Sequence, residues 1–259
     1  IFTICKKNDT CPPWQLTAEK ITHNKKNKNI KYDNAWLKIY DVPVLYFPKF
    51  FHPDPTVKRQ SGFLIPSIKS SSNGQEFLST PYFKVIDVNK DLTFSPRFYN
   101  NDKLLLQSEY RQNNKKSNHI ADFSISKDDN SSTKNHLFYK YDSILDISNF
   151  SESNIEINLQ KTSSDRYLKS NKIISAINNN YDVMESSLDI NLSSEDLLIK
   201  TDLIVFEDLT KNKKDRFEYI FPKISIAKNI TNTTKLNGDF EFLSDLYFKN
   251  YNTNVSEKI

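Results

Sequence analysis

Glycine is scarce in this sequence of 259 residues, occurring only three times, and methionine occurs once. So few glycines leave no room for a glycine-rich loop of the kind that binds nucleotide phosphates. No stretch approaches the roughly 18 consecutive apolar residues of a transmembrane helix, which excludes that class of membrane protein. Apolar residues at helical spacing are also nearly absent, and only 168–180 is predicted to hold a short helix within a loop. These absences favour a protein built from β-strands.

The two cysteines, Cys5 and Cys11, lie close together near the beginning of the sequence. No histidine or further cysteine follows them at metal-binding spacing, so a disulfide in an oxidising compartment is favoured over zinc. The disulfide has two possible forms, one between these cysteines and one to partners elsewhere. The sequence starts with neither an initiator methionine nor a basic-then-apolar signal segment, so we expect an excerpt of a longer protein.

Charged residues of both signs are spread along the chain, and 36 basic against 32 acidic residues leave a net charge of +4. This balance does not favour nucleic acid as a partner. The four histidines, His23, His52, His119 and His136, lie far apart, and none lies in an arrangement with a nucleophile or carboxylate typical of a catalytic site. A metal site at His52 and Asp54 would lack further ligands. The sequence therefore predicts neither an enzyme nor a cofactor.

What the sequence has in abundance is alternation of apolar and polar residues, the pattern of strands with two unlike faces. The first 50 residues contain three or four such segments, typical of the end of a small sandwich or jelly roll. The segment 42–50 is apolar but is predicted to be broken by Pro43 and Pro48. After Gly62 about ten or eleven segments alternate, separated by turns rich in Asn and Asp.

Each segment after Gly62 has about the 9–11 residues that cross a bilayer at a tilt, with one apolar face and one face of mixed charges and amides. A soluble sandwich also alternates, so a secreted glycan-binding module remains an alternative, as does another outer-membrane barrel, a pore or an enzyme. A long polar face suits a water-filled lumen better. The predicted fold is all-β: the end of a β-jelly roll at 1–50, a proline-containing joint at 51–61, and about half of a large antiparallel β-barrel at 62–259.

One stretch is more specific than the alternation. NAWLKIYDVPVLYFPKF, then KRQSGFLIP, the polar hairpin SSSNGQEF and a strand containing Pro81 closely resemble the LptD family, the lipopolysaccharide-assembly or organic solvent tolerance proteins. The resemblance covers Cys5 to about Tyr110. It implies a periplasmic jelly roll that receives lipopolysaccharide from a bridge of similar jelly rolls, LptA. It also implies a barrel of about 26 strands, plugged by the lipoprotein LptE, that delivers the lipid to the outer leaflet through a lateral gate.

The resemblance also implies roles for particular residues. Prolines in the first two barrel strands lie beside the lateral gate of the family, and Pro66 and Pro81 occupy the matching positions. Each removes a backbone donor from the seam. The other interpretation is that Pro66 starts an edge strand and Pro81 marks a bulge. Cys5 matches a cysteine of the family, whereas Cys11 is an addition, so the pairing stays open.

The remaining candidates lie in the joint and the jelly roll. Pro53 and Pro55 would stiffen the joint, and Lys58 and Arg59 would contact lipid phosphates or serve as an interfacial anchor. The acyl chains would lie in an apolar groove, although ordinary core packing explains the same residues: Leu16, Ala18, Leu37 and Ile39. The expected partners are lipopolysaccharide, LptE, LptA and outer-membrane lipid. The expected location is the outer membrane of a Gram-negative bacterium, with the N-terminal part in the periplasm.

Overall fold

The structure is a computed structural model, and it describes residues 14–26, 28–72, 74–127, 133–230, 238 and 240–252. The chain forms two compact units, one ending at Gln60 and the other beginning at Ser61. In both units the described residues form antiparallel strands, which confirms the all-β prediction. No helix in the described part of the chain has the length and apolar character needed to cross a bilayer. Cys5 and Cys11 lie outside the described residues, so their disulfide stays a prediction.

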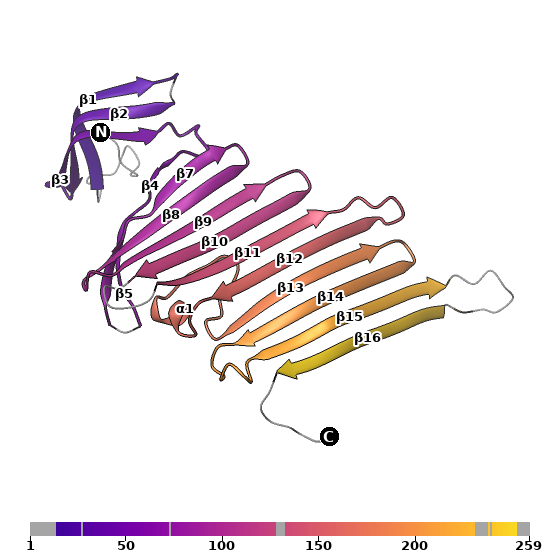
Figure 1. The fold of residues 1–259 in the computed structure, drawn as a ribbon. Helices are drawn as coiled ribbons and strands as arrows, with labels where there is room; N and C mark the ends of the chain where they lie inside the picture. The colour runs from indigo at the N-terminus through magenta and orange to yellow at the C-terminus, as the bar shows by residue number, and fades with distance from the viewer. Residues whose placement is uncertain are drawn as a thin grey trace. The chain divides into compact units, whose positions relative to one another are not determined.

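The first unit is a three-stranded antiparallel sheet in the order β1, β2, β3 (Figure 1). The strands are β1 Trp14–Asn24, β2 Asn29–Ile39 and β3 Val42–Pro53. β3 runs as one strand through Pro43 and Pro48, so the prediction that these prolines break it is wrong. The prolines are tolerated because β3 is an edge strand of this sheet, where a missing backbone donor interrupts fewer bonds. The ladder shifts register beside Pro43, between Leu37 and Lys38.

Asn34 produces a kink in the middle of β2. Its φ is +51°, a left-handed conformation that asparagine tolerates better than most residues. The β2–β3 ladder pairs Asp33 with Lys49 and Ala35 with Phe47, so Asn34 lies opposite Pro48 between these two pairs. Tyr32 and Ala35 are both buried although they lie three residues apart, which a regular two-residue alternation does not allow. The kink therefore brings apolar side chains from both halves of β2 onto one face.

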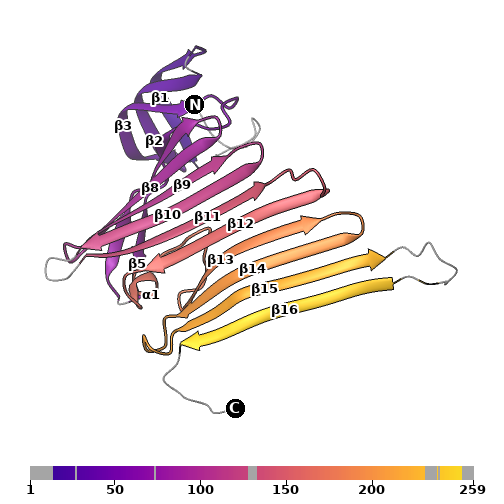
Figure 2. The same ribbon diagram turned by 45° about the vertical axis from the view of Figure 1, so that its right-hand side comes forward.

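The second unit is one antiparallel sheet of thirteen strand segments, seen from two angles in Figures 1 and 2. The segments are β4 Gly62–Phe63, β5 Ser67–Ser70, β6 Glu76–Ser79, β7 Tyr82–Asp87, β8 Lys90–Tyr99, β9 Leu104–Asn113, β10 Ser117–Lys127, β11 Lys134–Ile144, β12 Glu152–Thr162, β13 Val183–Ser193, β14 Leu197–Asp208, β15 Phe217–Ile230 and β16 Phe240–Asn252. From β8 to β16 each strand pairs with its neighbours in sequence. The sheet is open, with β4 and β5 at one edge and β16 at the other.

The two faces of this sheet differ as the alternation predicts. One face carries apolar side chains such as Phe123, Leu137 and Leu159, which are 40% to 51% exposed. We call it the apolar face; the opposite one, which carries side chains such as Gln107 and Ser124, is the polar face. All described strands of the second unit belong to this one sheet, so the described part of this unit lacks the second sheet that a β-sandwich within it would require.

The segment 163–182 between β12 and β13 folds back over the polar face, and we call it the strap. It begins with helix α1 Tyr167–Ser170. The short helix predicted in this loop is therefore confirmed, but it ends at Ser170 and the rest of the strap consists of turns, bends and irregular backbone. Asn171, Ile173 and Ser175 are buried while the residues between them are exposed. This alternation is typical of an extended segment that lies on a surface.

The apolar core of the second unit lies between the strap and the polar face. Its members come from the sheet, the strap and the turn after β14, and all are at most 6% exposed: Phe77, Tyr99, Leu105, Phe138, Tyr167, Leu168, Ile173, Met184 and Leu209. Burying a large apolar side chain stabilises a fold by about 1.5–3 kcal/mol. The strap contributes three of these side chains, so it is an integral part of the fold rather than a loose connection.

Candidate functional site: the proline seam and the face behind it

Pro66 and Pro81 lie in the gaps that divide the first two strands of the second unit. Residues 64–66 separate β4 from β5, and residues 80–81 separate β6 from β7. β4 pairs with β7 through two residue pairs and β5 with β6 through four, whereas the β9–β10 ladder has ten pairs. Across the gap, the Leu64 amide donates to the Pro81 carbonyl oxygen at 2.8 Å. We call this weakly paired region, 62–87, the seam.

A cavity of about 550 Å³ lies on the polar face directly behind the seam. Its apolar lining includes Leu64 and Ile65 of the seam and Ile174 of the strap. The basic residues Lys69 and Arg97 also line it, together with one acidic residue, Glu109. Such a lining can take an amphiphilic molecule, with apolar groups against one wall and an anionic group near the cations. Sequence reasoning missed Ile174, which only the path of the strap brings to the seam, and Arg97, which lies opposite Ser79 in the β6–β8 ladder.

Buried polar side chains of β8, β9, β10 and β11 form a network under the strap. Arg97 Nη2 donates to Gln107 Oε1 at 2.8 Å, and Gln107 Nε2 donates to both carboxylate oxygens of Asp122, at 3.0 and 3.1 Å. Ser124 Oγ lies 2.6 Å from Nδ1 of His136. His136 Nε2 lies 3.4 Å from Asp122 Oδ1 but makes no hydrogen bond within the described residues. All five side chains belong to residues that are at most 7% exposed.

Ser124, His136 and Asp122 are the residue types of a hydrolase triad. His136 therefore lies beside a hydroxyl and a carboxylate, a proximity that the sequence did not indicate. Ser124 Oγ also lies 2.7 Å from the hydroxyl of Tyr167 on the strap, and burial raises the pKa of that hydroxyl, which keeps it protonated. Because all three triad-like residues are fully buried, no substrate reaches Oγ in this structure. The contacts instead attach the strap to the sheet.

In the first unit the structure brings together three of the four residues predicted to line an acyl-chain groove. Leu16, Ala18 and Leu37 share one apolar cluster with the buried side chains around the Asn34 kink. Ile39 is 44% exposed and is not in that cluster. Alternation alone does not place the aromatic members of this cluster, because the kink changes which face of β2 the following side chains occupy. These members are Tyr32, Phe47 and Phe50.

In the joint, Asp54 pairs with His23 and not with His52, the histidine that the sequence analysis considered beside it. His23 Nε2 lies 2.5 Å from Asp54 Oδ2, whereas His52 Nε2 lies 2.7 Å from the hydroxyl of Tyr32. The pKa of Asp54 is lowered, chiefly because the backbone amide of Thr56 donates to its carboxylate. Over the described ranges, no group of three or more His, Cys, Asp or Glu side chains is placed to hold a metal.

Comparison with known proteins gives the same family that the sequence motifs indicate. Over 106 residues the chain is 39% identical to LPS-assembly protein LptD of Shewanella oneidensis, a match that covers 39% of the chain and 14% of that protein. The chain is similar to LptD. It is also 33% identical over 139 residues to LptD of Pseudomonas fluorescens, covering 54% of the chain and 14% of that protein. With LptD of Pseudomonas putida the identity is 38% over 106 residues, covering 39% of the chain and 11% of that protein.

The predicted resemblance to LptD is thus confirmed by several relatives. The chain matches only about 14% of the length of the first two of these LptD proteins. No family model matches the chain. Of the residues to which the LptD resemblance assigned roles, Pro66 and Pro81 meet at one seam, while Lys58 and Arg59 lie exposed in the joint and Pro53 and Pro55 lie at its start.

Proposed function

We propose that this chain takes part in lipopolysaccharide assembly at the outer membrane of a Gram-negative bacterium. In this proposal residues 1–50 are the end of a periplasmic β-jelly roll, 51–61 are the joint, and 62–259 are the first part of a transmembrane barrel. The apolar face meets lipid and the polar face lines the lumen. Three observations support the proposal: the similarity to proteins named LPS-assembly protein LptD, the two unlike faces and the weak seam.

The single observation that carries the mechanism is the sparse pairing at the seam. The edge strand is held by six residue pairs in two short groups, because Pro66 and Pro81 interrupt the strands. Each missing ladder hydrogen bond removes about 0.5–1.5 kcal/mol in water, and more in hydrocarbon. An edge strand attached so weakly can part from its neighbour, and a glycolipid can then pass sideways from the lumen into the membrane. The seam thereby acts as one side of a lateral gate.

The cavity behind the seam fits the same cargo. Leu64 and Ile65 offer an apolar wall for acyl chains, and Lys69 offers a cation for a phosphate of the lipid head group. In the first unit, acyl chains would follow the groove of Leu16, Ala18, Leu37 and Ile39. Lys58 and Arg59 would meet phosphates at the joint, which Pro53 and Pro55 stiffen. The partners proposed with this function are the jelly-roll bridge LptA and the plug lipoprotein LptE; the role is transport, not catalysis.

A disulfide across the seam tests the gate. Phe63 and Tyr82 are directly opposite each other on β4 and β7, with ring centroids 5.0 Å apart, so the pair Phe63→Cys and Tyr82→Cys can be bridged. In the full-length protein we expect oxidation of this pair to stop the arrival of lipopolysaccharide at the cell surface, and reduction to restore it.

The matched control places the bridge where the sheet is already fully paired. Ser117 and Ser143 are opposite each other in the ten-pair ladder of β10 and β11, and the variant Ser117→Cys with Ser143→Cys is expected to deliver lipopolysaccharide normally when oxidised. The single-cysteine variants report on any exchange with the two native cysteines. Normal delivery by protein in which the Phe63→Cys and Tyr82→Cys bridge has formed would overturn the gate proposal.

A further inference from the structure

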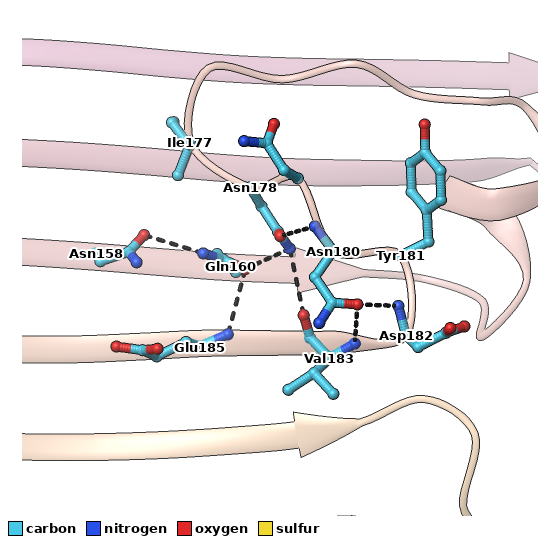
Figure 3. Close-up of a pocket in the computed structure, with 10 residues that line it drawn as sticks. Asn158, Gln160, Ile177, Asn178, Asn180, Tyr181, Asp182, Val183 and Glu185 are labelled. Carbon is cyan, nitrogen blue, oxygen red and sulfur yellow. Dashed lines mark hydrogen bonds between the residues drawn. The ribbon is translucent and has the colours of Figure 1, made fainter.

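A second cavity, of about 680 Å³, lies between the C-terminal part of the strap and strands β12 and β13 (Figure 3). Its volume is within the range of about 300–1,000 Å³ that is usual for small-molecule sites. The residues used below come from β12, the strap and β13: Asn158, Gln160, Asn178, Asn180, Asp182 and Glu185. Amide side chains are thus concentrated at one place of the molecule, where Figure 3 shows them converging.

Hydrogen bonds within the wall of this cavity hold it in shape. Asn178 Nδ2 donates to Gln160 Oε1 at 2.8 Å, and the same oxygen accepts from the backbone amide of Glu185 at 3.2 Å. Asn180 Oδ1 accepts from the backbone amides of Asp182 and Val183, at 2.9 and 3.2 Å. The strap and two strands are thereby joined around the cavity. A ligand entering it meets a preorganised surface, which lowers the entropy cost of binding.

The charges around this cavity select against anions. Its lining contains two carboxylates, on Asp182 and Glu185, and no lysine or arginine. Asp182 has a neighbouring cation outside the lining, Lys169 at 3.3 Å. Among the described residues, the carboxylate of Glu185 has no hydrogen-bond donor of its own. A phosphate would be repelled here, whereas hydroxyl groups can donate to the carboxylates and accept from the amides.

The apolar part of the lining is small and consists of Ile177, Tyr181 and Val183. Tyr181 and Ile177 are both half-buried and also pack against the apolar core of the second unit, so each offers the cavity part of its surface. An aromatic side chain offers an apolar face together with a hydroxyl at its tip. A ring with hydroxyls around its rim and C–H groups on its faces satisfies both kinds of wall at once.

We infer that this cavity binds a neutral saccharide. Its source is the uncharged sugar portion of the glycolipid that the chain handles, and this identification of the source rests on the proposed function. The cavity is separate from the one behind the seam, where Lys69 lies. The two sites therefore divide the cargo by charge, with phosphates near the seam and neutral sugars beside the strap.

Glucose and glucose 6-phosphate are suitable probes because they differ only in the phosphate. Full-length protein in detergent is titrated with each sugar, and binding is followed by saturation-transfer NMR. We expect glucose to bind in the millimolar range and glucose 6-phosphate to bind at least about tenfold more weakly, because of the two carboxylates. Absence of glucose binding, or equal affinity for the two sugars, would overturn the inference.

Variants assign the binding to this cavity. Asn158→Ala removes an amide from the lining and is expected to weaken glucose binding by about fivefold or more, the loss of a good hydrogen bond. Glu185→Gln keeps the shape and hydrogen bonding but removes a charge, so glucose binding should persist while the discrimination against glucose 6-phosphate falls. The matched control is Asn154→Ala, an exposed asparagine on the same face of the same strand and outside this cavity. If Asn154→Ala weakens glucose binding as much as Asn158→Ala does, the site lies elsewhere.

The source of the saccharide is tested separately from the seam. Arrival of lipopolysaccharide at the cell surface is measured for Asn158→Ala, and slower arrival supports the assignment to the carried glycolipid. Normal arrival together with lost glucose binding would overturn that assignment and leave the gate proposal intact. If the Phe63→Cys and Tyr82→Cys bridge does not stop delivery but glucose binds normally, the gate proposal fails and the saccharide site stands.

Discussion

Arg97 on β8 donates through Nη1 a 2.6 Å hydrogen bond to the backbone oxygen of Asn171, which lies 74 residues later in the strap. The side-chain oxygen of Asn171 in turn accepts from Lys103 Nζ at 2.6 Å and from the Tyr99 hydroxyl at 3.3 Å. Hydrogen bonds to charged groups contribute about 1.5–3 kcal/mol each, twice the usual amount. The turn after α1 is therefore the main polar attachment between the strap and the sheet.

Arg97→Ala should release the strap. The substitution leaves the Asn171 carbonyl and Gln107 Oε1 without their donor in a buried place, at a cost of about 1–3 kcal/mol for each unpaired group. We expect faster hydrogen exchange in the strap, measured by mass spectrometry on peptides covering 163–182. Arg111→Ala is the control, since Arg111 is half-exposed and pairs with Asp91 away from the strap. Equal exchange in the two variants would show that Arg97 does not hold the strap.

The beginning of the strap is attached by an ion pair that depends on pH. Arg216 Nη2 lies 2.9 Å from Asp165 Oδ2, and its hydrogen bond lowers the pKa of the Asp165 carboxyl. Because the folded pKa lies below the unfolded value of about 3.9, the contribution is present above pH 4 and is lost as the pH falls through the folded value. Asp165 is about half exposed, so the effect is small.

The corresponding prediction concerns exchange in the strap between pH 7 and pH 3. After correction for intrinsic rates, protection should stay constant down to about pH 4 and then fall. In Asp165→Asn the protection should be lower at pH 7, and the fall below pH 4 should be reduced. Asp146→Asn removes an exposed pair with Lys116 in another loop and should behave as the unsubstituted protein. A fall of the same size in Asp165→Asn would assign the acid effect to other groups.

The sequence predicts the two faces of the large sheet well because the direction of a strand side chain is fixed by a two-residue period. Leu106 and Gln107 fall on the predicted faces without any knowledge of the loops. Contacts made by the strap depend instead on the path of a twenty-residue connection, which no local pattern encodes. His136 was missed for another reason: its neighbours in space, Ser124 and Asp122, come from the adjacent strand through the register of the ladder.

The errors in the first unit have a different cause. Pro43 and Pro48 were expected to break a strand, but a proline is excluded only where both edges of the strand are paired, and the sequence does not say which strand is at an edge. The kink at Asn34 likewise follows from a backbone conformation that asparagine allows without requiring. Alternation alone therefore does not give the aromatic residues that share the apolar cluster of the first unit.

Replacing both seam prolines should strengthen the seam. In Pro66→Ala with Pro81→Ala, each new amide can donate across the gap, which adds about 0.5–1.5 kcal/mol of pairing per bond. We expect slower arrival of lipopolysaccharide at the cell surface and greater sensitivity to large hydrophobic antibiotics. Pro48→Ala is the control, because Pro48 lies in β3 of the first unit, outside the seam. Unchanged surface lipopolysaccharide in the double variant would remove the role of these prolines in the gate.

The kink in β2 predicts a specific order of stability for substitutions at Asn34. Asn34→Gly keeps the left-handed backbone and loses only the exposed hydrogen bonds to Glu19 and Tyr46. Asn34→Val should cost at least about 1–2 kcal/mol more, because a β-branched residue avoids this conformation and a regular strand would turn either Tyr32 or Ala35 away from the cluster. Thermal unfolding of the full-length protein, followed by tryptophan fluorescence, measures the difference. Equal unfolding temperatures for the two variants would mean that the kink does not determine which side chains share the apolar cluster of the first unit.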